Sequence, residues 1–384
     1  MQFDFDEDQQ HFIDSVEKYL HNEYTFEHRR AVLDQPIPYF DAKQWRAFGA
    51  MGWLGISLPE EYGGSAAPLT MAITVVEAFG KHLVVESFAN NILACGSLLI
   101  ALGSDEQKTR LLPTLASGEM QMAFAHAEHD MGVRGAIRTT ATTCPGGYRL
   151  SGRKTAVPGA ATANYWFVTA QMAENATDQT DLSVWLVDAK SDRVHVAPYR
   201  GIDGAQLAEL TFDNLELPTS SRLRGLEPAH LAIEDALALL LAATCVEAAG
   251  AMFALQKNTL DYVKVRKQFG SPLGKFQILQ HRLVDMFTQV ELSRPLAWLA
   301  VSNALNRATR PAILAAAKTQ ISAGCRFVAE NAMQTYGAIG MTDELNASHY
   351  FRRLIALEKH MGDQDHHLGI LAEALANGSP TLYN

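Results

Sequence analysis

The chain is poor in cysteine and has no paired arrangement of cysteines. Its 384 residues include four cysteines that stand far apart, and no Cys-x-x-Cys pair is present. This spacing argues against a disulfide framework and indicates reduced thiols. No signal peptide precedes the amphipathic, acidic start of the sequence, so we expect a cytoplasmic protein. The four cysteines are Cys95, Cys144, Cys245 and Cys325.

Basic residues are also scarce, and those present are dispersed along the chain. Lys and Arg number 32 against 42 Asp and Glu, which gives a net charge of −10 and a pI near 5.7. This balance argues against a nucleic-acid binder. Internal repeats and low-complexity linkers are absent. A chain of 42.1 kDa is long enough for two or three domains with cores of their own.

Charge is nearly missing from one long stretch. Between Asp235 and Lys257 the only charged residue is Glu247. About 20 apolar residues can cross a bilayer. However, the mean hydropathy of −0.05 and the lack of a second span or a basic flank argue against a membrane span. Two interpretations of Glu247 remain open: a buried carboxylate that abstracts a proton, or a structural acid of a core helix.

The residues after this stretch form a compact basic loop. The segment from Arg266 to Gly274 reads RKQFGSPLG. Its Gly and Pro residues predict that a helix ends in a turn here, with the Arg266 guanidinium close by and the Phe269 ring at the edge. An arginine in such a loop can clamp a pyrophosphate, while the ring can cover an adenine or ribityl group.

The periodicity of apolar residues changes twice along the sequence. Residues 1–120 show helical periodicity. Residues 121–225 carry short alternating apolar segments separated by Pro, Gly, Asp and Asn, and residues 226–384 are helical again and rich in Ala and Leu. This order predicts an N-terminal helical domain, a middle β domain and a C-terminal helical domain with these boundaries.

Four motifs in a fixed order resemble the acyl-CoA dehydrogenase family. They are GWLGISLPEEYGG, LGSDEQKTRLLPTLASGE, RKQFGSPLGKFQILQHRLVDM and QTYGAIGMTDE. With them the resemblance covers essentially the whole chain. It implies a mostly α protein with a central β domain: an N-terminal helical domain, a β-barrel or β-sandwich domain, and a C-terminal four-helix bundle.

The resemblance also implies a reaction, a cofactor and partners. In this family an acyl-CoA thioester is desaturated: its α-proton passes to a carboxylate while the β-hydrogen leaves as hydride to N5 of FAD. Hydrogen bonds to the thioester carbonyl stabilise the enolate-like charge. The implied partners are the acyl-CoA substrate, an electron-transfer flavoprotein as electron acceptor, and further subunits in a homo-oligomer or a heterotetramer.

Positions that bind the cofactor are carried over from the same resemblance. In the family the Arg-x-x-Phe-Gly loop and the Gln-x-x-Gly-x-x-Gly turn grip the pyrophosphate and adenine portion of FAD, usually across a dimer interface. The matching residues here are Arg266, Gln268, Phe269, Leu273, Phe276, Gln334, Gly337 and Ala338.

The chain departs from the family at the position of the usual base. That glutamate lies about 21 residues beyond the last glycine of the Gln turn, where this chain has Met361, and Met cannot accept a proton. The alternative family position, on the helix before the Arg loop, corresponds to Leu240. Glu247 lies two helical turns further on the same face. We therefore predict Glu247 as the base, with Glu358 and Asp363 as reserves.

A second departure concerns the flavin ring. The family's Thr-Glu-Pro-Gly and Trp-Ile-Thr segments hold this ring, whereas here residues 127–130 read AEHD and residues 156–158 read AVP. This predicts half an FAD site, as one subunit of a heteromer would keep. The ending EKHMGDQDHHL is similar to that of small subunits of pimeloyl-CoA and steroid side-chain dehydrogenases, which pair two unlike chains. Two functions therefore stay open: a catalytic subunit that uses Glu247, or a non-catalytic partner that completes the FAD site of another chain.

The same ending contains a pattern that imitates a metal site. His360, Asp363 and His367 fall at i, i+3 and i+7 spacing. Metal ligation needs tighter convergence than one helix face supplies. We therefore expect no metal there.

Overall fold

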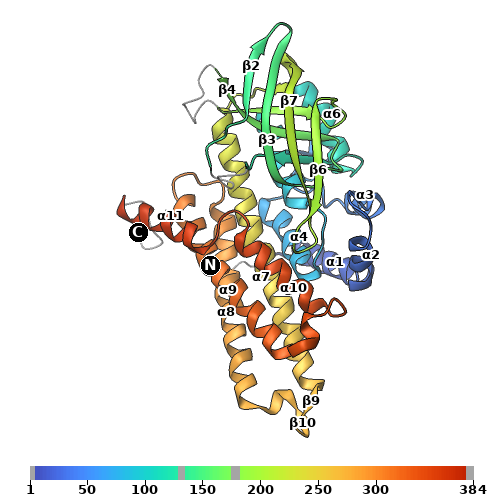
Figure 1. Cartoon of the computed structure of the whole chain (residues 1–384), viewed down its shortest axis with the longest axis vertical. Helices are drawn as coiled ribbons and strands as arrows, with labels where there is room; N and C mark the ends of the chain where they lie inside the picture. Colours follow the sequence, from blue (N-terminus) through green and yellow to red (C-terminus); the bar gives the residue numbers. More distant parts are fainter. Residues whose placement is uncertain (1–4, 129–134, 174–181, 378–384) are drawn as a thin grey trace. The chain divides into compact units, whose positions relative to one another are not determined.

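The structure, a computed structural model, describes residues 5–128, 135–173 and 182–377. Helices dominate both ends of the sequence, and the strands of a sheet come between them (Figure 1). This confirms the predicted mostly α fold with a central β domain. By internal contacts the chain divides into two compact units, neither continuous in sequence, so the three predicted domain boundaries stay a prediction. Unit 1 comprises Met1–Leu33, Ile73–Val84 and Leu241–Asn384, and unit 2 comprises Asp34–Ala72 and Val85–Leu240.

Unit 1 is helical. Its helix α9 packs against α8, α10 and α11, and Figure 1 shows α8 and α9 running side by side. Aspartate side chains cap the N-termini of two of its helices. The Asp6 carboxylate accepts from the backbone N–H of Gln9 at 2.8 Å, and Asp363 caps α11 in the same way. Such caps satisfy amides that a first helical turn leaves unpaired. The helices are α1 (Glu7–Glu23), α2 (Phe26–Leu33), the end of α4 (Leu69–His82), most of α7 (Ala229–Val265), α8 (Gln277–Asn303), α9 (Arg310–Tyr336), α10 (Asn346–Lys359) and α11 (Gln364–Ala376).

The backbones of α4 and α7 touch at two glycines. A Cβ atom on Gly80 would lie 2.2 Å from the carbonyl oxygen of Glu247, and one on Gly250 would lie 2.3 Å from that of Glu77. Any larger residue would force the helices apart, since real Cβ atoms do not come so close to backbone. The two contacts therefore fix the backbone of α7 at Glu247.

Helix α7 confirms the helix predicted around Glu247, and it runs unbroken from Ala229 to Val265. By length and composition alone it could cross a membrane. However, 83% of its most apolar 18-residue window is buried within the protein. A helix that is apolar on all sides and covered in this way is the arrangement of a core helix.

Unit 2 is built on a sheet with strand order β6-β7-β3-β2-β4-β5-β8, and β1 pairs in parallel with β4. Long antiparallel pairings join β3 to β7 and β4 to β5. The strands are β1 (Met122–Ala125), β2 (Thr140–Cys144), β3 (Gly147–Pro158), β4 (Tyr165–Met172), β5 (Leu182–Asp188), β6 (Val194–Arg200), β7 (Gln206–Pro218) and β8 (Arg222–Leu223). Unit 2 also holds α3 (Ala42–Ala50), α5 (Ser97–Leu102), α6 (Asp105–Ala116) and a π-helical segment, Ala89–Gly96.

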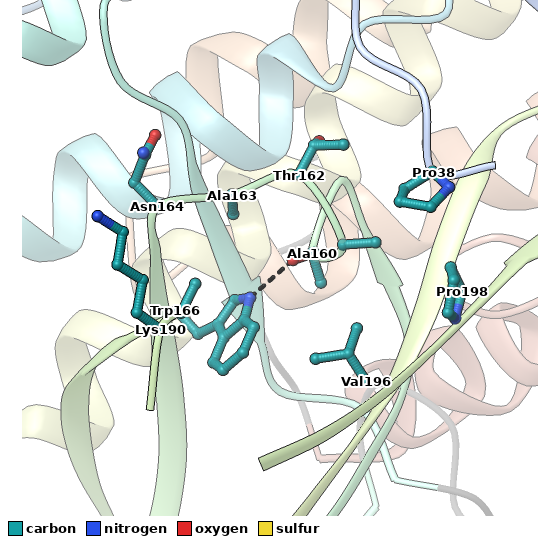
Figure 2. A pocket seen from close by; sticks show the side chains of 11 residues that line it. Pro38, Ala160, Thr162, Ala163, Asn164, Trp166, Lys190, Val196 and Pro198 are labelled. Atoms are coloured by element: carbon teal, nitrogen blue, oxygen red, sulfur yellow. Dashed lines mark hydrogen bonds between the residues drawn. The ribbon is translucent and has the colours of Figure 1, made fainter. Parts of the chain in front are cut away.

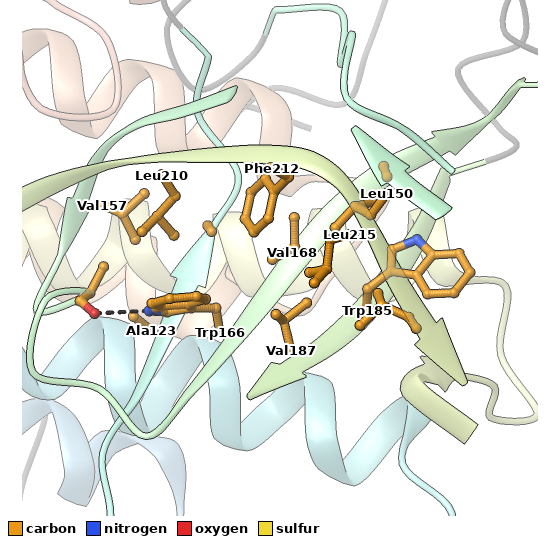
Figure 3. Close-up of a cluster of buried hydrophobic side chains, with 14 of the residues drawn as sticks. Ala123, Leu150, Val157, Trp166, Val168, Trp185, Val187, Leu210, Phe212 and Leu215 are labelled. Atoms are coloured by element: carbon orange, nitrogen blue, oxygen red, sulfur yellow. Dashed lines mark hydrogen bonds between the residues drawn. The ribbon is translucent and has the colours of Figure 1, made fainter. Parts of the chain in front are cut away.

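The core of unit 2 lies on one face of this sheet, where large and small side chains interdigitate (Figure 3). Trp166 and Trp185 are almost wholly buried there. The Trp166 indole N–H donates to the carbonyl of Ala160 at 2.8 Å, which satisfies the polar atom that a buried tryptophan brings with it. Because successive residues of a strand face opposite sides, this buried set fixes the register of the pairing.

Candidate active site

The predicted base, Glu247, is held by an ion pair. The Arg353 side chain, on α10, donates from Nε to Oε1 of Glu247 at 2.7 Å, and its Nη2 lies 2.5 Å from the same oxygen. The Glu247 side chain is 15% exposed. The local sequence around Glu247 gives no sign of Arg353, because the two residues lie 106 positions apart. An arginine at this distance orients the carboxylate through charge-assisted hydrogen bonds.

The two reserve acids hold structural positions. Glu358 is buried, and both of its carboxylate oxygens accept from Nη2 of Arg326, at 3.0 and 2.8 Å. Asp363 accepts from the backbone N–H of His366 at 3.1 Å and pairs with Lys359. The hydrogen bond from the His366 backbone, together with the contact from Lys359, holds the pKa of the Asp363 carboxyl below its usual value. Like Glu247, both reserve acids are therefore engaged by basic side chains or backbone donors, and Glu247 stays the predicted base.

Met361, at the position of the usual family base, sits in a turn that several side chains hold in place. Its φ of 63° lies in the left-handed region, and its side chain is buried. Buried Lys318 donates to the carbonyls of residues 357 and 358, both at 2.9 Å, and a ring nitrogen of His367 lies 2.9 Å from the Met361 carbonyl. Among the described residues no group of three or more His, Cys, Asp or Glu is placed as metal ligands would be.

The predicted basic loop is a small hairpin between β9 (Lys267–Gln268) and β10 (Ser271–Pro272). Phe269 and Gly270 form its tip with positive φ angles, and the Phe269 side chain is 89% exposed. The Phe276 ring meets that of Phe269 edge to face, with centroids 6.1 Å apart. Leu273 closes the loop by donating its N–H to the Arg266 carbonyl at 2.8 Å. A large exposed ring beside an exposed arginine fits a ligand that carries both a planar group and phosphates.

The predicted Gln turn lies at the end of α9. Gly337 has φ 69° and ψ −148°, a backbone conformation that essentially only glycine adopts. The space where its side chain would be is open, while Gln334 and Ala338 are exposed. Open space over a glycine allows a ligand to approach the backbone closely. Together with the hairpin, these are the residues that the resemblance assigns to the phosphate and adenine portion of FAD.

In unit 2, the two segments expected to hold the flavin ring come together. The N–H of Thr155, next to residues 156–158, donates to the Ala127 carbonyl at 2.9 Å. Ala127 and residues 156–158 carry no side-chain donor, so their side chains supply no hydrogen bond to a flavin ring. His129 and Asp130, part of the same prediction, lie outside the described residues.

Glu128, which belongs to the first of these segments, forms a buried ion pair that local sequence patterns do not indicate. Lys154 is fully buried, and its Nζ lies 2.7 Å from Oε1 of Glu128. Burial lowers the pKa of Lys154 to about 8, although Glu128 opposes the shift. Thr139 donates its hydroxyl to the same Glu128 oxygen at 2.7 Å, and Lys154 also donates to the hydroxyl of Thr169 at 3.1 Å. The network ties β3 to β4 and to the end of β1.

A pocket of about 450 Å³ also opens in unit 2, and none of the predicted base or FAD-binding residues is among those that line it (Figure 2). Its walls are mainly small apolar side chains with Val196 and Pro198, and Lys190 brings a cationic group to it. No acid lines it. The pocket therefore supplies no carboxylate for acid–base chemistry.

The chain matches three known domain families, which follow one another along the sequence. The N-terminal domain of acyl-CoA dehydrogenases matches residues 6–119, the middle domain matches residues 123–215, and the C-terminal domain matches residues 232–376. These three matches cover most of the chain. The first lies over the N-terminal helices, the second over most of the sheet, and the third over α7 to α11.

Individual relatives carry related activities. A 3-(aryl)acrylate reductase of Clostridium sporogenes is 28% identical over 321 residues, which are 80% of this chain and 83% of the relative. The protein described as "Probable acyl-CoA dehydrogenase YngJ" of Bacillus subtilis is 29% identical over 329 residues, 82% and 84% of the two chains. A solved structure, a variant of the Tcur3481-Tcur3483 steroid ACAD, superposes with a TM-score of 0.86 at 26% identity and covers 98% of this chain and 99% of its own.

Proposed function

Because the chain belongs to the acyl-CoA dehydrogenase family, whose members are flavin-dependent acyl-CoA oxidoreductases that use FAD, we propose that it desaturates an acyl-CoA as one subunit of an oligomer. The observation that carries this proposal is the hairpin at Arg266, whose Phe269 ring is 89% exposed. Exposing a large aromatic ring to water costs free energy, and this cost is avoided when the ring covers the FAD of the assembled enzyme.

Glu247 is the proposed base. When bound, FAD supplies the hydride acceptor for the β-carbon of the substrate. The task left to the chain is to remove the α-proton, and Glu247 is a partly shielded carboxylate on a helix whose backbone is fixed by Gly80. A carboxylate held in this way can act as the general base of this step.

A second candidate function is favoured by residues 127 and 156–158. Their side chains offer no hydrogen bond to a flavin ring, whereas the hairpin and the end of α9 fit the other half of FAD. In this second function the chain completes the FAD site of an unlike acyl-CoA dehydrogenase subunit, and Glu247 is a structural acid. Both functions make the chain part of a heteromer, for which a heterotetramer is the proposed form.

The variant Glu247→Gln separates the two functions, because it removes the proton acceptor and keeps the shape of the side chain. Acyl-CoA-dependent bleaching of the flavin is measured on the assembled enzyme, with FAD content as the control for assembly. If Glu247 is the base, bleaching falls by about 10³-fold or more while FAD content is unchanged. Nearly unchanged bleaching supports the second function.

The acyl group and electron acceptor complete the proposal. We propose a bulky acyl group, such as a steroid side chain, or a dicarboxylic one, together with an electron-transfer flavoprotein as acceptor, in the cytoplasm. The steroid ACAD among the superposable structures supports the bulky acyl group. A panel of acyl-CoA thioesters tests it: a higher kcat/KM for short straight chains than for steroid or dicarboxylic thioesters would contradict it.

A further inference from the structure

We infer that Arg353 is a positioning residue for Glu247, an inference that rests on the proposed role of Glu247 as the base. Two atoms of the Arg353 guanidinium contact the same carboxylate oxygen: Nε lies 2.7 Å and Nη2 2.5 Å from Oε1. Two donors on a single oxygen fix the position of that oxygen more tightly than one donor can. The geometry therefore assigns Oε2 as the atom that accepts the substrate proton.

The backbone beneath this pair cannot easily shift. Gly80 of α4 lies against the Glu247 carbonyl, and Gly250 lies against the carbonyl of Glu77 one helical turn further along. Because the backbone of Glu247 is fixed in this way, the direction of its carboxylate depends on the side-chain torsions of Glu247 and on Arg353. A positioned base gains most from such a fixed frame, because small displacements of a reacting group cost large factors in rate.

Within the described residues Glu247 pairs with Arg353, while the nearby charges of α4 have other partners. On α4, Glu77 pairs with Lys81 at 3.3 Å, and Arg294 of α8 lies 3.4 Å from the same Glu77 carboxylate. These contacts form a separate ionic group. Since the Glu247 and Arg353 side chains are only 15% and 24% exposed, solvent screens their interaction less than that of a surface pair.

In the proposed step the α C–H bond of the acyl-CoA breaks and the proton moves to Oε2 of Glu247. The electron pair of that bond forms the new carbon–carbon double bond. Bound FAD would be the oxidant and would supply the acceptor for the hydride that leaves the β-carbon. Arg353 stays protonated throughout and keeps Oε1 in place.

The test uses Arg353→Met and Arg353→Lys in the assembled enzyme. Arg353→Met is expected to lower kcat by about 10-fold or more with little change in KM, and to change the acid limb of the kcat/KM profile. Arg353→Lys keeps the charge with one donor group and is expected to restore part of kcat and most of the pH profile.

The matched control is Arg352→Met. Arg352 is the next residue of α10 and pairs with exposed Asp343, at 2.5 Å. Its removal deletes the same number of charges from the same helix without touching Glu247. We expect kcat and the pH profile of this variant to match those of the wild type.

The outcomes separate the inference from the function on which it rests. If Glu247→Gln abolishes turnover but Arg353→Met changes only the melting temperature, the positioning role is overturned and the base stands. If Glu247→Gln retains turnover, the proposed base is wrong. If Arg353→Met does not fold, Arg353→Lys decides alone: a wild-type kcat and pH profile would overturn the need for two donors on Oε1.

Discussion

Tyr262 of α7 and Tyr336 of α9 pack ring against ring, with centroids 4.4 Å apart. One turn beyond Tyr262 the chain reaches Arg266, and Gly337 directly follows Tyr336. The contact thus brings the ends of two helices together, and with them the two segments that the sequence assigned to FAD. The hairpin and the Gln turn therefore both begin within a few residues of this contact.

Replacing Arg266 with Gln is expected to weaken FAD binding by the assembled enzyme. A charge-assisted hydrogen bond contributes about 1.5–3 kcal/mol, which corresponds to roughly a 10- to 150-fold rise in the Kd of FAD. Lys275→Gln changes an exposed cation at the foot of the same hairpin and serves as the control. Equal Kd values for both variants and the wild type would remove Arg266 from the site.

The glycine contact between α4 and α7 predicts a stability effect. Gly80→Ala places a Cβ atom 2.2 Å from the Glu247 carbonyl and is expected to cost about 2–4 kcal/mol in the free energy of unfolding, since the two backbones must separate. Gly369→Ala is the control, because Gly369 lies within α11 and has open space around it. That change should be neutral or stabilise by about 0.5–1 kcal/mol. Urea denaturation of both variants measures the difference.

The buried pair of unit 2 predicts a larger loss. Glu128→Gln removes the charge opposite fully buried Lys154, and an uncompensated buried charge costs about 3–5 kcal/mol. The exposed pair between Arg149 and Glu216, at 3.1 Å, is the control. Glu216→Gln should cost less than about 1 kcal/mol. Similar losses in the free energy of unfolding for the two variants would show that burial does not determine how much these ion pairs contribute to stability.

Acid should destabilise unit 1 through His349. Burial, with Arg29 and Arg352 nearby, lowers the pKa of this histidine from 6.5 to about 4. Between these two values the unfolded chain binds the proton and the folded chain does not, so stability falls as the pH falls from about 6.5 to about 4. The loss amounts to at most about 3 kcal/mol. In His349→Gln this part of the pH dependence of urea denaturation should disappear, and a profile parallel to that of the wild type would contradict the assignment.

Local patterns in the sequence predict much of this fold. The change from helical to alternating periodicity located the sheet, and the Gly and Pro residues after Arg266 predicted the turn that the structure shows as a hairpin. The lone charge of a long apolar stretch placed Glu247 on a core helix. These features depend on neighbours a few residues apart, which is the range over which periodicity and turn chemistry act.

What the sequence did not predict depends on residues far apart in the chain. Arg353 comes within reach of Glu247 only when α10 packs in unit 1, and Gly80 meets Glu247 only where α4 crosses α7. The pair of Lys154 and Glu128 likewise joins β3 to the segment that follows β1. Single-sequence patterns carry no signal for such contacts. For Glu247 the omission matters most, because the partner changes what the carboxylate can do.

The measurement that tests the central claim most directly is the amount of FAD per polypeptide in this chain purified alone, with its mass in solution recorded on the same sample. The account predicts little or no FAD, because Ala127 and residues 156–158 offer a flavin ring no side-chain hydrogen bonds, and it predicts that FAD is retained once an unlike subunit is added. About one FAD per chain in a homo-oligomer would contradict the shared site and show a self-sufficient dehydrogenase.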